Sequence, residues 1–439
     1  MVTDGVGRQG MWMRLAALWG WVWRSAAAVP PLGWLIGAFC AAVLELLIGY
    51  ELAIMLYLPK VPPLFGATLL FQNPLLFPAT LLFDLLVYIL PVCAVAFGTQ
   101  RLTDRAAAFL EHRPTWLAAL MHLVLMYAIL HVWTEASAYR LQVSKLVMIA
   151  VMLTLSLNVI NGYMGEFSCS HPGFMALGAY AASVFTLVLF TQDRLFGPAL
   201  LPAALGPFCY PLALFIGGMT AALGALVVAI PSFRTRGDYL AIISLAFMFI
   251  VKSAIENIEP VGGPRGMGGQ PNWSTLPVVF TAMALCIWII NNFVRSTLGK
   301  ALNAVRDNET AADAMTINTR RTKMVAFMFG AFWAGVAGGL YAHEVRHVTP
   351  GGFGIQMLAE QLAMVYFGGL NSVVGSVVGA VSISMVSEVL KPLGLYKWLV
   401  IPLILILVMI FRPTGLIAFR DFDIKRILAP RKAALKRRE

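Results

Sequence analysis

Residues 296–323 read STLGKALNAVRDNETAADAMTINTRRTK, a polar segment between two almost wholly apolar runs near 276–294 and 325–342. Within it, residues 307–309 (DNE) are of the types that cap and start a helix. The sequence therefore predicts a short helix over residues 310–315. An internal loop that keeps a helix of small side chains is typical of a surface on which another molecule docks. The apolar neighbours of this segment thus inform the fold, and the segment itself informs the function.

The composition is that of a polytopic membrane protein. Of the 439 residues, 59% are hydrophobic and 12% are charged, with a mean hydropathy of +0.79, whereas soluble domains carry about 25% charged residues. The sequence contains twelve apolar segments, near 31–56, 76–98, 116–134, 143–161, 172–190, 209–232, 238–258, 276–294, 325–342, 357–369, 373–390 and 398–411. A full span needs about 20 residues, so the short segments at 357–369 and 398–411 are expected to be tilted, partial or longer. We predict an all-α fold with about 10–12 transmembrane or partial helices.

The net charge of +11 follows membrane topology rather than a nucleic-acid site. With both chain ends on one side, the loops of that side hold 23 Lys/Arg and the opposite loops hold 8, while Lys252 lies inside a span. Lys and Arg are enriched in cytoplasmic loops, so both termini and residues 296–323 are predicted to be cytoplasmic. Residues 1–30 then form an interfacial segment, and the basic residues 423–439 form a tail that is solvated or lies on anionic lipid.

Two regions of the chain differ in composition. Residues 31–142 hold helices with few glycines, and we interpret them as an additional transmembrane layer. Residues 143–422 are rich in Gly, Ala and Ser. Small residues let helices approach closely in lipid, so this second region is predicted to be a tightly packed bundle.

Polar residues alternate with glycines in a second informative stretch, LNVINGYMGEFSCSHPGFMALGAY at 157–180. Irregular backbone at membrane depth is tolerated only where it is buried in protein or lines a wet cavity. The stretch is therefore either a plain loop before a helix that starts at Pro172, or a re-entrant element that lines a path. A glycine loop at 261–269 is predicted on the outer side. The candidate pathway residues are Asn158, Gly162, Gly165, Ser168, His171, Phe174, Gly262, Gly263 and Gly266.

A membrane metalloprotease is a rival hypothesis. Residues 343–347 read HEVRH and match HExxH, in which His343 and His347 would bind zinc and Glu344 would activate water. Against this, residues 349–352 (TPGG) would end the helix within a turn, and Arg346 would put a cation beside the metal. The other histidines offer no obvious third ligand, and the five cysteines are far apart. We predict no metal and no disulfide.

A proton-coupled carrier is the other alternative. Its intramembrane acids would be Glu45, Asp84 and Glu388, which we expect to be scattered rather than clustered. Lys252 and Glu256 lie four apart in one predicted helix and are expected to pair. A carrier would leave the predicted docking helix without a purpose. The chain has no GxxxxGK[ST] phosphate loop, so it is not expected to bind ATP.

The ordered motifs resemble those of the permease subunits of ABC importers for branched-chain amino acids, specifically the LivM-type subunit. The resemblance covers roughly residues 145–418. Besides 157–180 and the loop at 298–318, it rests on RTRGDYLAI (234–242), GGPRGMGGQP (262–271), AGVAGGLYAH (334–343), FGGLNSVVGSVVGA (367–380) and FRPTGL (411–416).

The resemblance implies a transport subunit of the prokaryotic inner membrane without catalytic chemistry of its own. Its partners would be a second permease subunit, two cytoplasmic ATPases that bind ATP-Mg, and an external solute-binding protein. It would import small hydrophobic amino acids by alternating access, with urea, amides or other amino acids as the alternative substrates in this family. The loop helix would sit in a cleft of the ATPase through Arg306, Asp307, Asn308, Glu309, Ala311, Ala312, Met315 and Ile317, where the two small alanines would permit close approach.

Two residues depart from the family's pattern. Thr316 stands where glycine is usual, and a β-branched residue resists positive φ, so the turn after the loop helix is expected to differ. Glu166 stands where glutamine is common, and it adds a charge near the candidate pathway.

Overall fold

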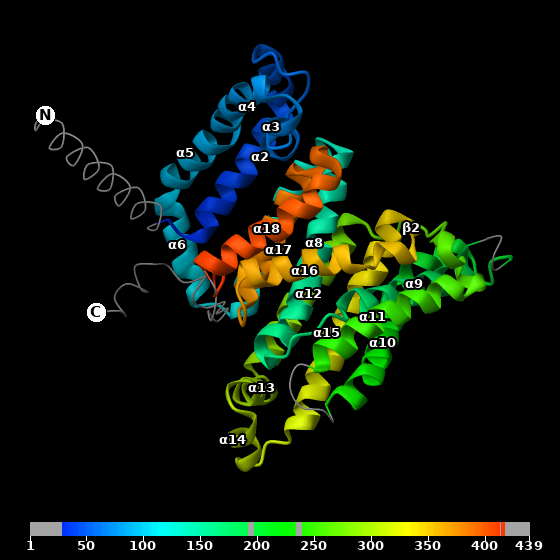
Figure 1. Cartoon of the computed structure of the whole chain (residues 1–439). Helices are drawn as coiled ribbons and strands as arrows, with labels where there is room; N and C mark the ends of the chain where they lie inside the picture. Colours follow the sequence, from blue (N-terminus) through cyan, green and yellow to red (C-terminus); the bar gives the residue numbers. More distant parts are fainter. Residues whose placement is uncertain (1–28, 192–196, 234–238, 413, 418–439) are drawn as a thin grey trace, which may run out of the picture. The chain divides into compact units, whose positions relative to one another are not determined.

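The computed structural model describes residues 29–191, 197–233, 239–412 and 414–417 (Figure 1). This part of the chain is largely helical, and ten of its helices are long and apolar enough to cross a membrane. The predicted all-α polytopic membrane fold is confirmed. The predicted interfacial segment (1–30, apart from its last two residues), the basic tail (423–439) and residues 234–238 lie outside the described residues.

The chain divides into two compact units, with the boundary between Arg140 and Leu141. The helices of the first unit are α2 (Pro31–Met55), η1 (Pro63–Gly66), α3 (Leu69–Gln72), η2 (Pro74–Leu76), α4 (Phe77–Asp84), η3 (Leu85–Ile89), α5 (Leu90–Gly98), α6 (Gln100–Glu111) and α7 (Thr115–Glu135). Residues 74–98 form one continuous apolar span although three kinds of helix succeed one another in it.

The second unit holds most of α8, whose first residues up to Arg140 belong to the first unit, together with the remaining helices and a short antiparallel sheet in which Met267 faces Val348. Its elements are α8 (Ala138–Asn158), η4 (Val159–Met164), α9 (His171–Phe190), η5 (Ala203–Leu205), α10 (Gly206–Ser232), α11 (Tyr239–Asn257), η6 (Glu259–Val261), η7 (Gly263–Arg265), β1 (Met267–Gly268), α12 (Leu276–Arg295), α13 (Thr297–Asp307), α14 (Glu309–Ala314), α15 (Thr319–Val345), β2 (His347–Val348), η8 (Pro350–Gly352), α16 (Ile355–Gly368), α17 (Val373–Val389), η9 (Lys391–Tyr396) and α18 (Lys397–Phe411).

Every apolar segment predicted from the sequence contains a helix. Of the two segments expected to be short or incomplete, 357–369 is α16, with 14 residues, and 398–411 is α18, with 15 residues. The second is longer than the prediction, because η9 and α18 together form one apolar stretch over Lys391–Phe411.

The core of the second unit is the contact of α9, α10 and α15 through glycines. A Cβ atom on Gly178 would lie 2.5 Å from the carbonyl carbon of Gly335, and one on Gly335 would lie 2.7 Å from the carbonyl oxygen of Gly217. In lipid, apolar surface alone gives helices no drive to associate, and close backbone approach supplies the packing instead. The predicted small-residue packing of this region is confirmed at these positions.

Buried charges gather in the first unit. Arg140 forms an ion pair with Glu45 at 2.7 Å, donates a hydrogen bond to the carbonyl oxygen of Pro62 at 2.8 Å, and lies 4.9 Å from the centre of the Trp133 ring. Asp84 interacts electrostatically with both Glu45 and Arg140. The expectation that the intramembrane acids are scattered is therefore wrong for Glu45 and Asp84, since the fold brings α2 and α4 together around one guanidinium.

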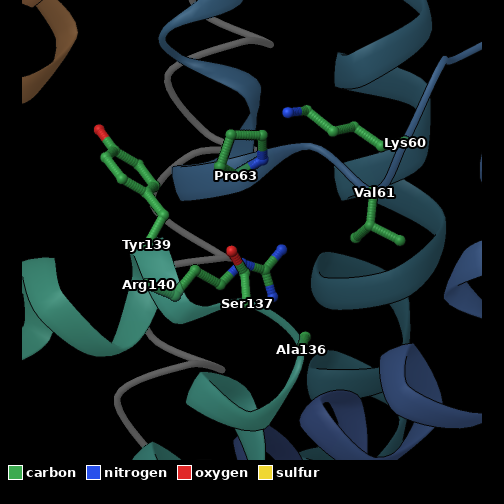
Figure 2. A pocket seen from close by; sticks show the side chains of 7 residues that line it. All are labelled: Lys60, Val61, Pro63, Ala136, Ser137, Tyr139 and Arg140. Atoms are coloured by element: carbon green, nitrogen blue, oxygen red, sulfur yellow. The ribbon is translucent and has the colours of Figure 1, made fainter.

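A small cavity of about 100 Å³ adjoins this charged cluster (Figure 2). Its lining comes from two segments that precede and follow spans of the first unit, Lys60, Val61 and Pro63 on one side and Ala136, Ser137, Tyr139 and Arg140 on the other. Since the guanidinium of Arg140 already bonds Glu45 and a carbonyl, the cluster has a structural role in joining these segments.

Charged side chains of the second unit also pair within single helices or turns. Lys252 and Glu256 on α11 lie 3.9 Å apart, which confirms the predicted pair. Glu388 at the end of α17 lies 3.2 Å from Lys391. Each of these acids thus has a cationic neighbour close in sequence.

We predict that Gly178→Ala lowers the free energy of unfolding by at least about 2 kcal/mol, because the added methyl group meets backbone that has no room to move. The thermal unfolding midpoint of the purified protein in detergent measures this. Gly98→Ala is the matched control, since a Cβ there meets nothing within 4 Å, and it should leave the midpoint unchanged or slightly higher. Equal midpoints for the two variants would contradict the packing argument.

Candidate functional site

The polar loop between α12 and α15 folds into two capped helices. The Ser296 hydroxyl accepts a hydrogen bond from the Gly299 amide at 3.3 Å and starts α13, and Asn308 Oδ1 accepts one from the Ala311 amide at 3.0 Å and starts α14. Figure 1 shows α13 and α14 next to one another, close to the beginning of α15. The predicted short helix is confirmed, with bounds Glu309–Ala314, and Asn308 is the member of the 307–309 stretch that caps it.

Most of the α14 surface is open to solvent. Ala311 is exposed, and Met315 directly after the helix is 75% exposed. Ala312, in contrast, is only 4% exposed, because α14 turns one face toward α13 and α15. The expectation that both alanines allow a partner to approach is therefore wrong for Ala312, and Ala311 remains.

The turn after α14 has ordinary geometry in spite of Thr316. The Thr316 amide donates to the carbonyl oxygen of Asp313 at 3.0 Å, and the Ile317 amide donates to that of Ala312 at 3.1 Å. These two bonds define a common helix-ending motif whose residue after the cap is left-handed, and Thr316 has φ = 68°. The expectation of a different turn is wrong: the turn is kept, and the β-branched residue accepts a conformation that is strained for it.

Lys323, in the second turn of α15, joins the loop helix to the stretch that follows η4. Its Nζ lies 2.6 Å from Glu166 Oε1 and 2.9 Å from Glu309 Oε2. The Lys323 side chain is 10% exposed, whereas that of Glu309 is 53% exposed. Glu166, one of the two departures noted in the sequence, therefore has a partner within hydrogen-bond distance.

Arg306 forms a second connection between the loop and η4. Its Nη1 donates to the carbonyl oxygen of Gly162 at 3.4 Å, and its Nε and Nη2 donate to Asp307 Oδ1 at 2.9 and 2.8 Å. The Arg306 stem occupies the space that a side chain on Gly165 would need. Gly165 has φ = 76°, so glycine suits this position both for its backbone and for the contact.

A cavity of about 310 Å³ lies where the end of α13, the end of η4 and the turn between α16 and α17 meet. It is lined by Asn161, Gly162, Gly165, Phe167, Arg306, Tyr366, Leu370 and Asn371. It brings together Gly162 and Gly165 from the predicted pathway and Arg306 from the predicted docking loop.

Sequence reasoning missed three polar residues of this cavity, Asn161, Tyr366 and Asn371. Asn161 and Asn371 both belong to motifs that the resemblance uses, LNVIN and FGGLN. A polar amide inside a glycine-containing motif at a span end is the signal that could have identified them.

The other predicted pathway residues of the 157–180 stretch lie in the protein interior and do not line this cavity. Asn158 donates from Nδ2 to Ser376 Oγ at 2.6 Å and accepts at Oδ1 from the Asn371 amide at 3.1 Å, which ties α8 to α17. The Ser168 amide donates to Asn161 Oδ1 at 3.2 Å, and the buried His171 ring lies 5.9 Å from that of Phe174. Asn158 and Ser168 therefore support the cavity residues Asn371 and Asn161, whereas His171 and Phe174 pack in the interior.

Local packing also makes Cys169, the cysteine of the 157–180 stretch, unreactive. The Cys169 amide donates to Ser244 Oγ at 2.9 Å. Burial raises the pKa of the Cys169 thiol to about 11, so the reactive thiolate is scarce at neutral pH.

The glycine loop lies at the far end of α15 from the cavity. Gly262, Gly263 and Gly266 have φ of 88°, 53° and 80°, and Gly266 packs against the backbone at Val348, just after α15. A helix rises about 1.5 Å per residue, so the 27 residues of α15 separate this loop from α14. The three glycines are therefore not part of the described cavity.

The HEVRH motif does not place two histidines on one helix face. The helix α15 ends at Val345, Arg346 has φ = 61°, and His347 is an exposed residue of β2. His343 is buried, with Nε2 3.0 Å from Thr186 Oγ1 and Nδ1 2.8 Å from the carbonyl oxygen of Gly339. Glu344 lies 2.6 Å from Lys145. Zinc binding by this motif needs the shared face, so the protease hypothesis loses its geometric basis.

Comparison with known proteins identifies transport permeases as relatives. A family model described as branched-chain amino acid transport system, permease component, matches residues 139–411. The high-affinity branched-chain amino acid transport system permease protein LivM of Escherichia coli (strain K12) is 30% identical over 311 residues, which is 63% of this chain and 69% of that protein. LivH of the same strain is 26% identical over 61% of this chain and 90% of its own length. No solved structure matches the chain significantly.

We predict that Thr316→Gly stabilises the end of α14 by about 1 kcal/mol, because glycine adopts positive φ without steric cost. Hydrogen exchange of the peptide that covers residues 309–318 should slow by about fivefold. Thr310→Gly, at an exposed position inside the same helix, is the control and should speed exchange. Faster exchange in both variants would show that Thr316 is not strained.

Proposed function

This chain belongs to the family of branched-chain amino acid transport system permease components, and we propose that it moves branched-chain amino acids inward as one permease subunit of an ATP-driven importer. Residues 139–411, which the family model matches, include nearly the whole second unit with its packed bundle, its loop helices and its cavity. The first unit supplies three further candidate spans ahead of this region.

The energy for transport comes, in this proposal, from partner subunits. We infer a complex with a second permease subunit, two cytoplasmic ATPases that bind ATP-Mg, and an extracytoplasmic solute-binding protein, in the inner membrane of a prokaryote. Two kinds of relative, LivM and LivH, are each named as permease proteins, which supports a pair of different permease subunits. The distribution of Lys and Arg supports a cytoplasmic position for both termini and for the α13–α14 loop.

The observation that carries the proposal is the exposed, independently capped helix α14 between two spans. Its exposed residues include Ala311 and Asp313, on either side of the buried Ala312, and Met315 directly after its end is exposed as well. An exposed methionine adapts to the shape of an apolar cleft, and an exposed alanine lets a partner's backbone come close. We propose that this face docks in a cleft of the ATPase and receives its motion.

The cavity beside the loop supplies a site for the transported solute. Its volume of about 310 Å³ falls at the lower end of the range for small-molecule sites. The amides of Asn161 and Asn371 suit the charged ends of an amino acid, while Phe167 and Leu370 suit a branched aliphatic side chain. We propose that it is part of the pathway at its cytoplasmic end, and that the chain performs no chemistry of its own.

We predict that Ala311→Trp reduces ATP-dependent uptake by at least about tenfold, because an indole on the open face of α14 prevents close docking. Uptake is measured in vesicles that contain the chain with its partner subunits. Ala108→Trp, at an exposed alanine of α6, is the control and should transport normally. Membrane insertion should be equal in both. Normal uptake by the Ala311 variant would refute the docking assignment.

We predict that unlabelled leucine and valine inhibit uptake of labelled leucine, while urea at the same excess does not. An apolar wall selects a branched side chain, and urea lacks one. Uptake should persist in the presence of an uncoupler while ATP is held constant, since no proton gradient drives it. Competition by urea alone would favour the amide alternative within the same family, and loss of uptake with the uncoupler would favour a proton-coupled carrier.

A further inference from the structure

The ion pairs of Lys323 connect three separate elements of the second unit. Lys323 belongs to α15, Glu309 is the first residue of α14, and Glu166 lies just past η4. One ammonium group reaches both carboxylates, at 2.6 and 2.9 Å. The Lys323 side chain therefore links the helix α14 to the end of the span that lines the cavity.

Lys323 is the buried member of this group of charges. Lys323 is 8% exposed, so its charge is poorly hydrated and depends on the two carboxylates. Among the residues that the structure describes, Lys323 is the cation that pairs with Glu166 or Glu309. Glu166 and Glu309 are more exposed than Lys323, at 26% and 53% of their side chains. Removal of the Lys323 charge takes away the cation that the two carboxylates share, and they would then repel each other.

The connection continues from Glu166 into the bundle. Glu166 follows the π-helical turn η4 (Val159–Met164), and Asn158 immediately before this turn bonds Ser376 of α17. π-Helical turns are rare and occur often at functional sites. A displacement of α14 therefore acts through Lys323 on a turn whose other end is fixed to the α16–α17 pair, beside the cavity.

We infer that Lys323 is a positioning residue that transmits the movement of the docked α14 helix to the cavity wall at η4. This inference rests on the proposed function, because it assigns a route for the motion that the ATPase delivers. Lys323 does not contact the solute or ATP in this inference. It keeps α14 and η4 moving as one body, so that ATP hydrolysis and solute release remain linked.

The test measures uptake and ATP hydrolysis in the same vesicles, with the chain assembled with its ATPases, second permease and binding protein. Lys323→Met keeps the apolar stem and removes the charge, and it should lower the amount of leucine transported per ATP hydrolysed by at least about tenfold. Lys323→Arg keeps the charge and should retain most of that ratio. Lys300→Met, at an exposed lysine of α13, is the matched control and should not change it.

The amount of leucine transported per ATP hydrolysed distinguishes a loss of transmission from a loss of folding or assembly. A variant that only assembles poorly lowers uptake and hydrolysis together and leaves their ratio at the wild-type value, and that result would overturn the inference. Glu309→Gln, which preserves the Lys323–Glu166 pair, should lower the ratio less than Lys323→Met. The double variant should be no worse than Lys323→Met alone, because both substitutions break the same connection. Additive losses would overturn it as well.

Uptake by the wild-type complex distinguishes a failure of the proposed function from a failure of the role assigned to Lys323. Absence of ATP-dependent leucine uptake by the wild-type complex would refute the proposed function. Normal wild-type uptake together with an unchanged ratio in Lys323→Met would refute only the role of Lys323 and would leave the function in place.

Discussion

The packing of α15 against α9 and α10 is the constraint on which the second unit depends. Apolar side chains gain nothing by leaving lipid for one another, so these helices associate where Gly178, Gly217 and Gly335 let their backbones approach. A helix held in this way has a fixed axis. The first turns of α15 contact α13 and α14, and its last turn leads into the β1–β2 ladder.

The loop that precedes α15 is ordered by polar contacts. Asn308 caps α14, Arg306 reaches the carbonyl oxygen of Gly162, and Lys323 binds two carboxylates from different elements. Polar contacts of this kind are directional and fail when their partners move apart. These contacts relate the position of α14 to one specific turn of the bundle, which suits the docking role that we propose for this helix.

Elsewhere in the chain, the fold brings together or separates residues in ways that their spacing in the sequence does not indicate. Glu45 and Asp84 are 39 positions apart in sequence, and only the contact of α2 with its neighbours brings them to Arg140. The HEVRH motif shows the reverse, because two histidines that a continuous helix would place together are separated when α15 ends between them. Thr316 is a local example. The hydrogen bonds of the turn hold it at positive φ, although its β-branched side chain disfavours that conformation.

Composition, apolar length and ordered local motifs are enough to predict the membrane class, the position of the helices, the short capped helix of the loop and the family. Three facts emerge only from the packed helices: which side of α14 is open, which of the pathway candidates meet in one cavity, and that Glu166, Glu309 and Lys323 form one cluster. These facts depend on side chains that are distant along the chain and become neighbours only when helices pack. Lys323 and Glu166 are 157 residues apart, and no local sequence pattern predicts that they pair. The structure shows that they do.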